Sequence, residues 1–253
     1  MSGKERHVGL FVTCLVDLLR PEIGFATARL LEMAGCTVVV PSAQTCCGQP
    51  AWNAGADDHA RALARQTIDA FAGLDYVVAP SGSCAGTIKR HYPTMLADDA
   101  AYAAKARDLA DRTYELSAFL VRICGMNDLA ARTNTKITYH DSCSSLRDLG
   151  VRNEPRALLA QIAGTELCEL SDGEVCCGFG GMFSAKYPEI STHMADNKLA
   201  DVESTGAEML VGNDLGCLMH LEARAKHQKR NLRVRHIAEF LCEAMPEPDT
   251  GKV

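Results

Sequence analysis

Two adjacent cysteine pairs constrain this chain more than any other feature of its sequence. The pairs are Cys46-Cys47 and Cys176-Cys177, and a glycine follows each of them. Each pair has one further cysteine upstream and one downstream, at nearly the same distances in the two halves of the chain. These flanking residues are Cys14 and Cys84 in the first half, and Cys143 and Cys217 in the second. Eight of the twelve cysteines therefore form two matched sets of four, which random cysteine usage would not produce.

The secondary structure expected around these cysteines repeats in the same way. Short apolar or β-branched runs predict strands, and longer segments with apolar residues at helical spacing predict helices. In the first half we expect strands at 7–13, 37–40 and 76–79, and helices at 21–34, 57–71 and across most of 93–125. In the second half we expect strands at 136–139, 166–170 and 208–211, and helices at 153–164, 187–204 and 236–244. The matching order indicates an internal duplication.

Alternating strands and helices predict a fold class. They favour right-handed βαβ units around a parallel sheet in each half. We therefore expect an α/β protein with two pseudo-symmetric Rossmann-like domains, the first over residues 1–128 and the second over residues 129–253. The polar stretch 126–134 between them is too short to be a flexible tether, so we expect the two domains to pack together.

Composition and charge argue against several classes of protein, namely nucleic-acid-binding, membrane-inserted and disulfide-stabilised proteins. The net charge of −6 and the lack of any long Lys/Arg run argue against a nucleic-acid surface. The sequence has no signal-peptide cleavage site and no 18-residue apolar run, so we expect a cytoplasmic protein without membrane insertion. In a reducing compartment, twelve cysteines do not predict a disulfide framework. The remaining choices are metal ligands, redox-active thiols or buried apolar side chains.

The repeated cysteines all lie directly after predicted strands, in segments that we expect to be loops. Because the carboxyl ends of parallel strands meet at one edge of a sheet, each half should gather four thiols there. We expect the two cysteine-rich edges to face one another. Thiolates select iron–sulfur clusters, zinc or cuprous ions, and adjacent cysteines suit a centre with several metal atoms better than a mononuclear site. The glycines after each pair should let backbone amides face the sulfurs.

The cysteine spacing and several longer motifs of this chain resemble those of known protein families. The repeated cysteine spacing resembles the cysteine-rich CCG domain of iron–sulfur oxidoreductases such as the B subunit of heterodisulfide reductase. More narrowly, the motifs PEIGFATARLLEMAG, QTCCGQP, PSGSC, TYEL, CCGFGG and CLMH resemble the lactate utilization protein A family over nearly the whole chain. The resemblance implies an iron–sulfur cluster, of the 4Fe-4S type, in each half. It implies cluster ligation by Cys14, Cys46, Cys47, Cys84, Cys143, Cys176, Cys177 and Cys217.

The resemblance also implies a function and partners. It implies an electron-transfer subunit, an oxidoreductase component active only with its partners, in a three-part system that oxidises L-lactate to pyruvate and allows growth on lactate. The implied partners are a ferredoxin-bearing iron–sulfur protein and a third component. Two alternatives stay open: a catalytic thiol–disulfide oxidoreductase like heterodisulfide reductase, and a non-enzymatic zinc-binding scaffold. No G-x-G-x-x-G sequence follows a predicted strand, so hydride chemistry by this chain alone is not expected.

One departure from the heterodisulfide reductase pattern concerns a fifth ligand. Each repeat there ends in C-x-x-C, whereas the last position here is Thr87 in the first half and His220 in the second. Thr87 is a poor iron ligand, but His220 can bind through a ring nitrogen, as histidines do in Rieske centres. We favour ordinary hydrogen bonding for His140 and Asp141, with orientation of a thiolate or relay of a proton as the alternative. The remaining cysteines are expected to be core residues: Cys36, Cys124, Cys168 and Cys242.

Overall fold

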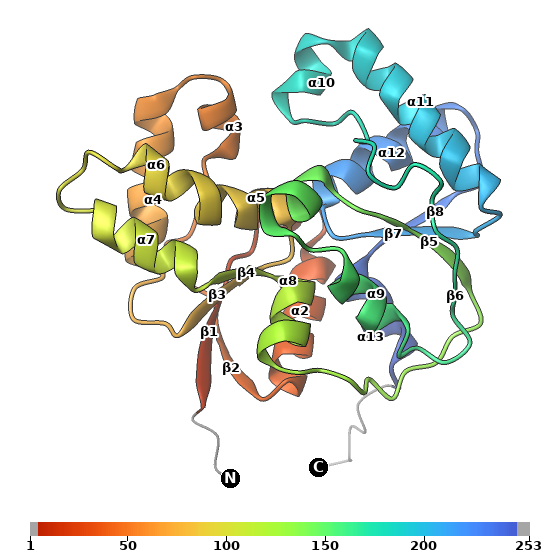
Figure 1. Cartoon of the computed structure of the whole chain (residues 1–253), viewed down its shortest axis with the longest axis horizontal. Helices are drawn as coiled ribbons and strands as arrows, with labels where there is room; N and C mark the ends of the chain where they lie inside the picture. The colour runs from red at the N-terminus through yellow and green to blue at the C-terminus, as the bar shows by residue number, and fades with distance from the viewer. Residues whose placement is uncertain (1–4, 247–253) are drawn as a thin grey trace.

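The computed structural model describes residues 5–246 and contains two four-stranded parallel sheets, one from each half of the chain (Figure 1). The first sheet has the order β2-β1-β3-β4, and the second has the equivalent order β6-β5-β7-β8. The strands are β1 (Arg6–Leu10), β2 (Cys36–Val39), β3 (Tyr76–Ala79), β4 (Thr113–Glu115), β5 (Lys136–His140), β6 (Glu166–Leu167), β7 (Met209–Gly212) and β8 (Arg233–His236). The α/β class and the duplication are thus confirmed. The boundary at 128/129 stays a prediction, and residues 1–4 and 247–253 of the two expected domains lie outside the described residues.

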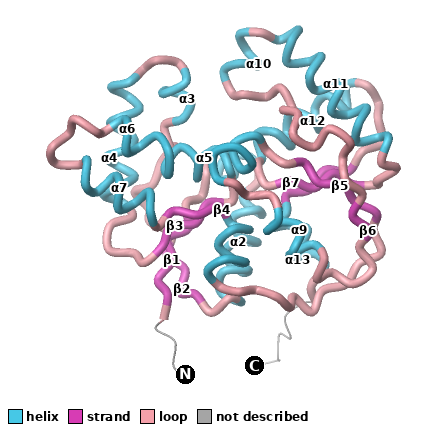
Figure 2. Tube along the Cα trace, in the orientation of Figure 1, coloured by secondary structure: helices cyan, strands magenta, loops and turns pink. Residues whose placement is uncertain are grey.

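A layer of helices lies between the two sheets (Figures 1 and 2). The last helix of each half packs against the first long helix of the other half. Thus α13 (Ile237–Ala244) contacts α2 (Pro21–Met33), and α8 (Leu116–Ala118) contacts α9 (Asn153–Leu159). One apolar core runs through this layer and joins both sheets, with Val8 and Val78 from the first sheet and Ile137 and Val211 from the second. The two halves therefore share their largest core.

The opposite face of each sheet has a smaller core of its own. Side chains alternate between the faces of a strand, so Val78 points into the shared core while Val77 and Ala79 point outward. The outward residues of the first sheet pack under α4 (Asp57–Ala70), α6 (Tyr92–Met95) and α7 (Ala103–Asp111). In the second half, α11 (Pro188–Ser204) and α12 (Leu215–His227) cover the corresponding face.

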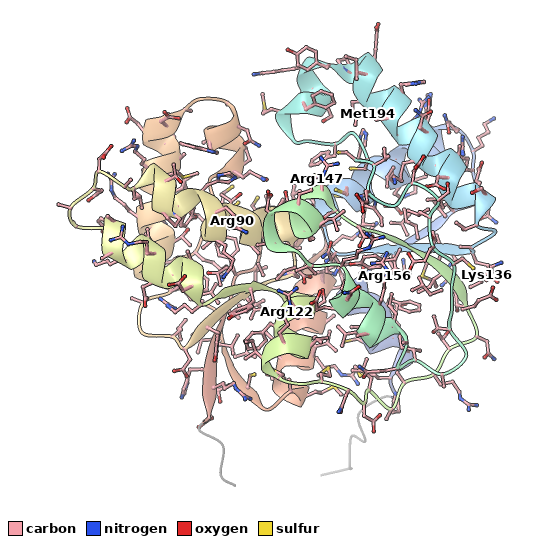
Figure 3. The ribbon with its side chains drawn as sticks, viewed as in Figure 1. Arg90, Arg122, Lys136, Arg147, Arg156 and Met194 are labelled. Atoms are coloured by element: carbon pink, nitrogen blue, oxygen red, sulfur yellow. The ribbon has the colours of Figure 1, made fainter. Side chains whose placement is uncertain are left out.

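Polar contacts between the halves lie at the edges of this shared core. The Nε of Arg90 donates to the Asp148 carbonyl oxygen at 2.7 Å, and the Nε of Arg122 donates to Glu154 Oε1 at 2.7 Å. Figure 3 shows both arginines beside the green segments of the second half. Arg20 forms an ion pair with Glu222 at 2.5 Å. These contacts fix how the two sheets sit relative to one another.

The structure differs from the expected elements in three places. Strands β4 and β8 were not expected, because β4 (TYE) lies inside the stretch 93–125 that was expected to be mainly helical and β8 (RVRH) has a single apolar residue. The expected strand 166–170 pairs only at Glu166–Leu167. Short helices also replace expected loops: α1 (Cys14–Leu19), α3 (Gln49–Asn53), α5 (Gly82–Gly86), α10 (Met182–Lys186) and the π-helical turns η1 (Thr87–His91) and η3 (Ser144–Asp148). The π-helical turn η2 (Phe119–Ile123) lies in the stretch 93–125, where helix was expected. No helix within residues 5–246 is long and apolar enough to cross a membrane.

Candidate metal centres

The first set of four thiols, called here the first quartet, consists of Cys14, Cys46, Cys47 and Cys84. Cys14 is the first residue of α1, directly after β1, and Cys84 lies in α5, directly after β3. The side-chain oxygens of Thr13 and Ser81 cap the N-termini of these two helices. Each cap fixes the first turn of its helix, which carries the cysteine. The expected loop positions of Cys14 and Cys84 are therefore wrong: both cysteines occupy a short helix. Only the adjacent pair lies in a loop, between β2 and α3.

The four sulfurs of the first quartet meet, as the strand positions predicted. The Sγ of Cys14 lies 3.8 Å from that of Cys46, and the Sγ of Cys47 lies 3.4 Å from that of Cys84. Cys46 and Cys47 also contact each other, so the sulfurs form one continuous chain. At these separations the sulfurs are in contact, so the four thiols gather in one small space, and a group of thiolates is a donor set that suits a soft metal.

The second quartet, Cys143, Cys176, Cys177 and Cys217, repeats this arrangement. Cys143 follows β5 and begins a helical turn, and Cys217 lies in the first turn of α12, after β7. The sulfurs of Cys177 and Cys217 lie within 4.8 Å of each other, and Cys143, Cys176 and Cys177 lie close enough to shift one another's pKa. The chain of four sulfurs therefore has the same order in both halves. Here too the flanking cysteines are helical and not, as expected, in loops.

Backbone amides face the sulfurs, as expected from the glycines after each pair. The Gly48 N–H points at Cys46 Sγ at 3.5 Å, and the Gly178 N–H points at Cys176 Sγ at 3.4 Å. The second quartet has an additional donor, because the Phe179 N–H points at Cys177 Sγ at 3.5 Å. Such N–H groups stabilise negative charge on sulfur and tune a metal bound to it.

The thiols of each quartet differ in pKa. The pKa of Cys46 falls to about 2 because its sulfur accepts hydrogen bonds from the Cys14 and Cys47 thiols. The pKa of Cys176 likewise falls to about 2, because its sulfur accepts from Cys143 and Cys177. The hydrogen bond to Cys46 raises the pKa of Cys14, and the hydrogen bond to Cys176 raises that of Cys143. A metal that binds to either quartet must therefore displace protons from the thiols whose pKa is raised. The donor set fits a thiolate-bound metal centre.

Both quartets open onto one cavity of about 330 Å³ between the halves. Its lining includes all four cysteines of the first quartet, together with Cys143 and Cys217 of the second. Asp214 lines this cavity and joins the two halves. Its Oδ2 accepts hydrogen bonds from the Ser81 hydroxyl at 3.0 Å and from the Ser83 N–H at 2.9 Å. A carboxylate of the second half thereby anchors the helix that carries Cys84.

Two residues before the second quartet have different environments. Asp141 accepts two hydrogen bonds from Arg156, at 3.0 and 2.8 Å, so ordinary bonding is confirmed for it. Figure 3 shows Arg156 on α9. His140 is 1% exposed and neither ring nitrogen has a hydrogen-bond partner among the described residues, so ordinary bonding is wrong for it. Its ring lies within 4.8 Å of the sulfurs of Cys177 and Cys217.

Thr87 and His220, which occupy the positions of the fifth cysteine in the heterodisulfide reductase pattern, have different environments. Thr87 is buried, and its hydroxyl donates to the Ser83 carbonyl oxygen at 2.8 Å. His220 is half-buried, with Nε2 3.3 Å from Ser191 Oγ and its ring against Phe179. A ligand role for His220 stays a prediction.

The other four cysteines lie outside both quartets. Cys36 and Cys124 approach each other at 4.0 Å at the edge of the shared core. Cys168 donates to Glu166, and Cys242 donates to the Ala26 carbonyl oxygen. Sequence reasoning missed Asp214, although an acidic residue just before a helix is a familiar capping signal, and Asp214 does cap α12.

Comparison with known families gives two matches within the chain. The family model described as a cysteine-rich domain, CCG, matches residues 8–89 and 137–222, which include all or most of six of the strands and both quartets. Lactate utilization protein A from Bacillus subtilis is 48% identical over 234 residues, which are 92% of this chain and 98% of the relative. Lactate utilization protein A from Shouchella clausii is 45% identical over 235 residues, with 93% and 98% covered.

A solved structure shares the fold. A crystal structure of a hypothetical protein from Helicobacter pylori superposes with a TM-score of 0.67 at 10% sequence identity. The match covers 98% of this chain and 50% of the other, so this chain spans about half the length of that protein. At this identity the likeness concerns the fold alone.

Proposed function

The chain belongs to the lactate utilization protein A family of cysteine-rich CCG proteins, and from this premise we propose that it is an iron–sulfur electron-transfer component of an L-lactate oxidation system. The observation that carries the proposal is the meeting of two sulfur quartets at one interface, each built from residues far apart in the sequence. We propose the eight cysteines of these quartets as the ligands.

The fit of the residues to an iron–sulfur centre rests on three features. The sulfurs of each quartet gather in one place, amide N–H groups point at them, and the pKa of one thiol in each quartet lies far below its usual value because neighbouring thiols donate hydrogen bonds to it. When bound, an iron–sulfur cluster supplies one-electron transfer at a potential set by charge, hydrogen bonds and burial. The chain's own residues hold the sulfurs in place and limit their contact with water: Cys47, Cys84, Cys177 and Cys217 are each less than 9% exposed.

The implied reaction is the oxidation of L-lactate to pyruvate, which releases two electrons and two protons. In the proposed role this chain passes electrons and does not bind lactate itself. The partners are those implied by the family: a ferredoxin-bearing iron–sulfur protein and a third component. The cytoplasmic location stays a prediction.

Metal content tests the proposal directly. The full chain, purified without oxygen, should contain iron and acid-labile sulfide and give an EPR signal after reduction. Cys46→Ser and Cys176→Ser should each remove about half of the iron if the quartets hold separate clusters. Cys168→Ser is the matched control, because Cys168 lies outside both quartets and should leave the iron unchanged. Colourless wild-type protein with stoichiometric zinc would overturn the proposal in favour of the scaffold.

A link to lactate needs a test in cells. Deletion of the gene from the organism that encodes it should abolish growth on L-lactate while growth on pyruvate continues. The wild-type gene should restore growth and Cys46→Ser should not. Full growth of the deletion strain on L-lactate would contradict the lactate role.

The shared cavity favours a second candidate, a thiol–disulfide oxidoreductase. A cavity of about 330 Å³ that is lined by cysteines from both halves has room for a small disulfide. Reduction of a disulfide to two thiols consumes two electrons, which a chemical reductant would supply in the assay, and two protons, which come from water. Turnover of a small disulfide by the isolated chain with reduced methyl viologen would favour this candidate, whereas an electron carrier should be inert.

A further inference from the structure

The second quartet contains a buried histidine that has no partner in the chain. His140 is the last residue of β5 and is 1% exposed. Neither Nδ1 nor Nε2 makes a hydrogen bond to any described residue. A buried polar group without a partner destabilises the folded chain, and native structures rarely retain one without a reason. His140 is therefore placed to receive a partner that the polypeptide does not supply.

The surroundings of His140 indicate what that partner is. A ring nitrogen of His140 and the sulfurs of Cys177 and Cys217 all lie within 4.8 Å of one another, and all three residues are buried. Imidazole nitrogen and thiolate sulfur together are typical ligands of iron and zinc. One metal atom can satisfy the histidine and both sulfurs, whereas a water molecule would satisfy the histidine alone.

The charged neighbours of His140 are already engaged elsewhere. Asp141 is held by Arg156, and Asp214 is held by Ser81 and Ser83. Lys198 is 1% exposed and its Nζ donates to the Asp172 carbonyl oxygen at 2.6 Å. None of these groups is bonded to the imidazole, and Lys198, a cation, cannot accept a proton or bind a metal.

The internal duplication supplies a comparison within the same molecule. His140 lies three residues before Cys143, and Phe11 lies three residues before Cys14. Phe11 is fully buried and belongs to the apolar cluster that contains Cys47 and Cys84. At the same place in the fold, the first quartet thus has a phenyl ring and the second has an imidazole. A position that served packing alone would accept phenylalanine in both halves.

We infer that His140 is a nitrogen ligand of the metal centre held by the second quartet, and that the first quartet binds metal through thiolates only. The inference rests on the proposed metal binding but not on the role in lactate oxidation. A neutral imidazole adds no negative charge to the centre, and histidine ligation raises the potential of iron–sulfur clusters. The second centre should therefore be reduced before the first in a titration with dithionite.

Nitrogen hyperfine coupling tests this ligand directly. Full-length protein is purified without oxygen, reduced, and measured by pulsed EPR with natural histidine and again with ¹⁵N-histidine. We expect a strong coupling that changes with the isotope, disappears in His140→Phe and persists in the control His193→Phe, because His193 is exposed and its ring nitrogen lies against Asn197. Loss of the ligand should weaken metal binding at the second quartet by at least roughly 10–100-fold, while the first quartet keeps its metal.

The outcomes separate this inference from the proposed function. Iron without histidine coupling in the wild-type protein, or a coupling unchanged in His140→Phe, overturns the inference and leaves the proposed function standing. The isotope comparison needs no substitution, so it decides the matter even if His140→Phe does not fold. Protein without iron overturns the proposed function. In that case the same coupling, measured after loading with cobalt(II), decides whether His140 binds metal.

Discussion

Gly178 and Gly48, which follow the two cysteine pairs, occupy the same position in the duplication but have different amounts of space. Both have positive φ values, +90° and +85°, which side chains other than glycine rarely adopt. A Cβ on Gly178 would lie 2.6 Å from the Ser191 carbonyl oxygen and 2.9 Å from the Cβ of Met194, a residue labelled in Figure 3. A Cβ on Gly48 would meet nothing closer than 3.4 Å.

This difference predicts unequal effects of alanine. Gly48→Ala should lower the free energy of unfolding by about 1–2 kcal/mol, from backbone strain alone. Gly178→Ala adds a clash with backbone and should cost about 3 kcal/mol or more, with loss of metal from the second quartet. Urea unfolding of the two variants measures the loss of unfolding free energy, and their iron content measures the loss of metal. Equal losses would show that the space around the glycines does not matter.

His236 is a buried histidine with both ring nitrogens bonded, in contrast to His140. Its Nε2–H donates to the Pro80 carbonyl oxygen of the first half at 3.1 Å, and its Nδ1 accepts from the Ala238 N–H at 3.1 Å. Burial lowers the pKa of His236 to about 4. The ring is therefore neutral at pH 7 and joins the two halves in that form.

The stability of the protein should consequently depend on pH. An unfolded histidine takes up a proton near pH 6.5, while His236 in the folded protein does so only near pH 4. Protons thus favour the unfolded chain, and this residue's contribution of up to roughly 3 kcal/mol should be lost as the pH falls from 6.5 to 4. His236→Asn keeps an acceptor for the helix cap but has no such titration. Urea unfolding at several pH values should give a smaller slope for the variant, and an unchanged slope would contradict the assignment.

At the scale of elements, helix α5 joins the two halves through one face. Gly82 faces the second half: a Cβ there would lie 1.8 Å from Ser145 Oγ and 2.8 Å from Ser142 Oγ. Gly86, one turn later in α5, has more room, because a Cβ there would lie 3.5 Å from Asp148. Close approach of the halves therefore depends on the lack of a side chain at residue 82.

Two alanine variants of α5 test this close approach. Gly82→Ala should force the halves apart, lower the free energy of unfolding by several kcal/mol and expose the quartets to thiol reagents. Gly86→Ala should be neutral or slightly stabilising, because alanine favours helix. Unfolding midpoints and the rate of thiol labelling measure both effects. A Gly82→Ala protein as stable as Gly86→Ala would mean that the two halves are not in close contact at α5.

At the scale of the whole molecule, the shared core makes one folding unit of the two halves. Helix α13, from the end of the chain, packs on α2 near its beginning, and Figure 1 shows both in the middle of the molecule. Leu30 and Leu31 of α2 belong to the same core cluster as Phe240 and Leu241 of α13. A half produced alone would expose this apolar surface to water.

We therefore expect the complete chain to unfold in a single transition and the fragments 1–128 and 129–253 to fail to fold separately. Circular dichroism and urea titration of each fragment, and of the two fragments mixed, test this expectation. Recovery of native signal only in the mixture would support it. A cooperative transition in fragment 1–128 alone, with the midpoint of the complete protein, would show two independent domains.

The sequence by itself determined the class of the fold, the duplication and the grouping of the eight cysteines. Apolar periodicity is a local property, so it predicts strands and helices that are long enough to show it. The cysteines after β1, β2 and β3 could be placed together because parallel strands end at one edge of a sheet. Strands β4 (TYE) and β8 (RVRH) escaped prediction because each has at most one apolar residue, whereas the equally short β3 (YVVA) and β7 (MLVG) are almost wholly apolar.

Only the tertiary structure decided which groups meet across the halves. The contact of Asp214 with Ser81, the packing of α13 on α2 and the space around Gly82 depend on the relative position of two sheets. The contrast between His140 and Phe11 is visible as letters in the sequence, but its meaning depends on burial and on the lack of a partner. These properties arise from contacts between residues far apart in the chain, which no local pattern encodes.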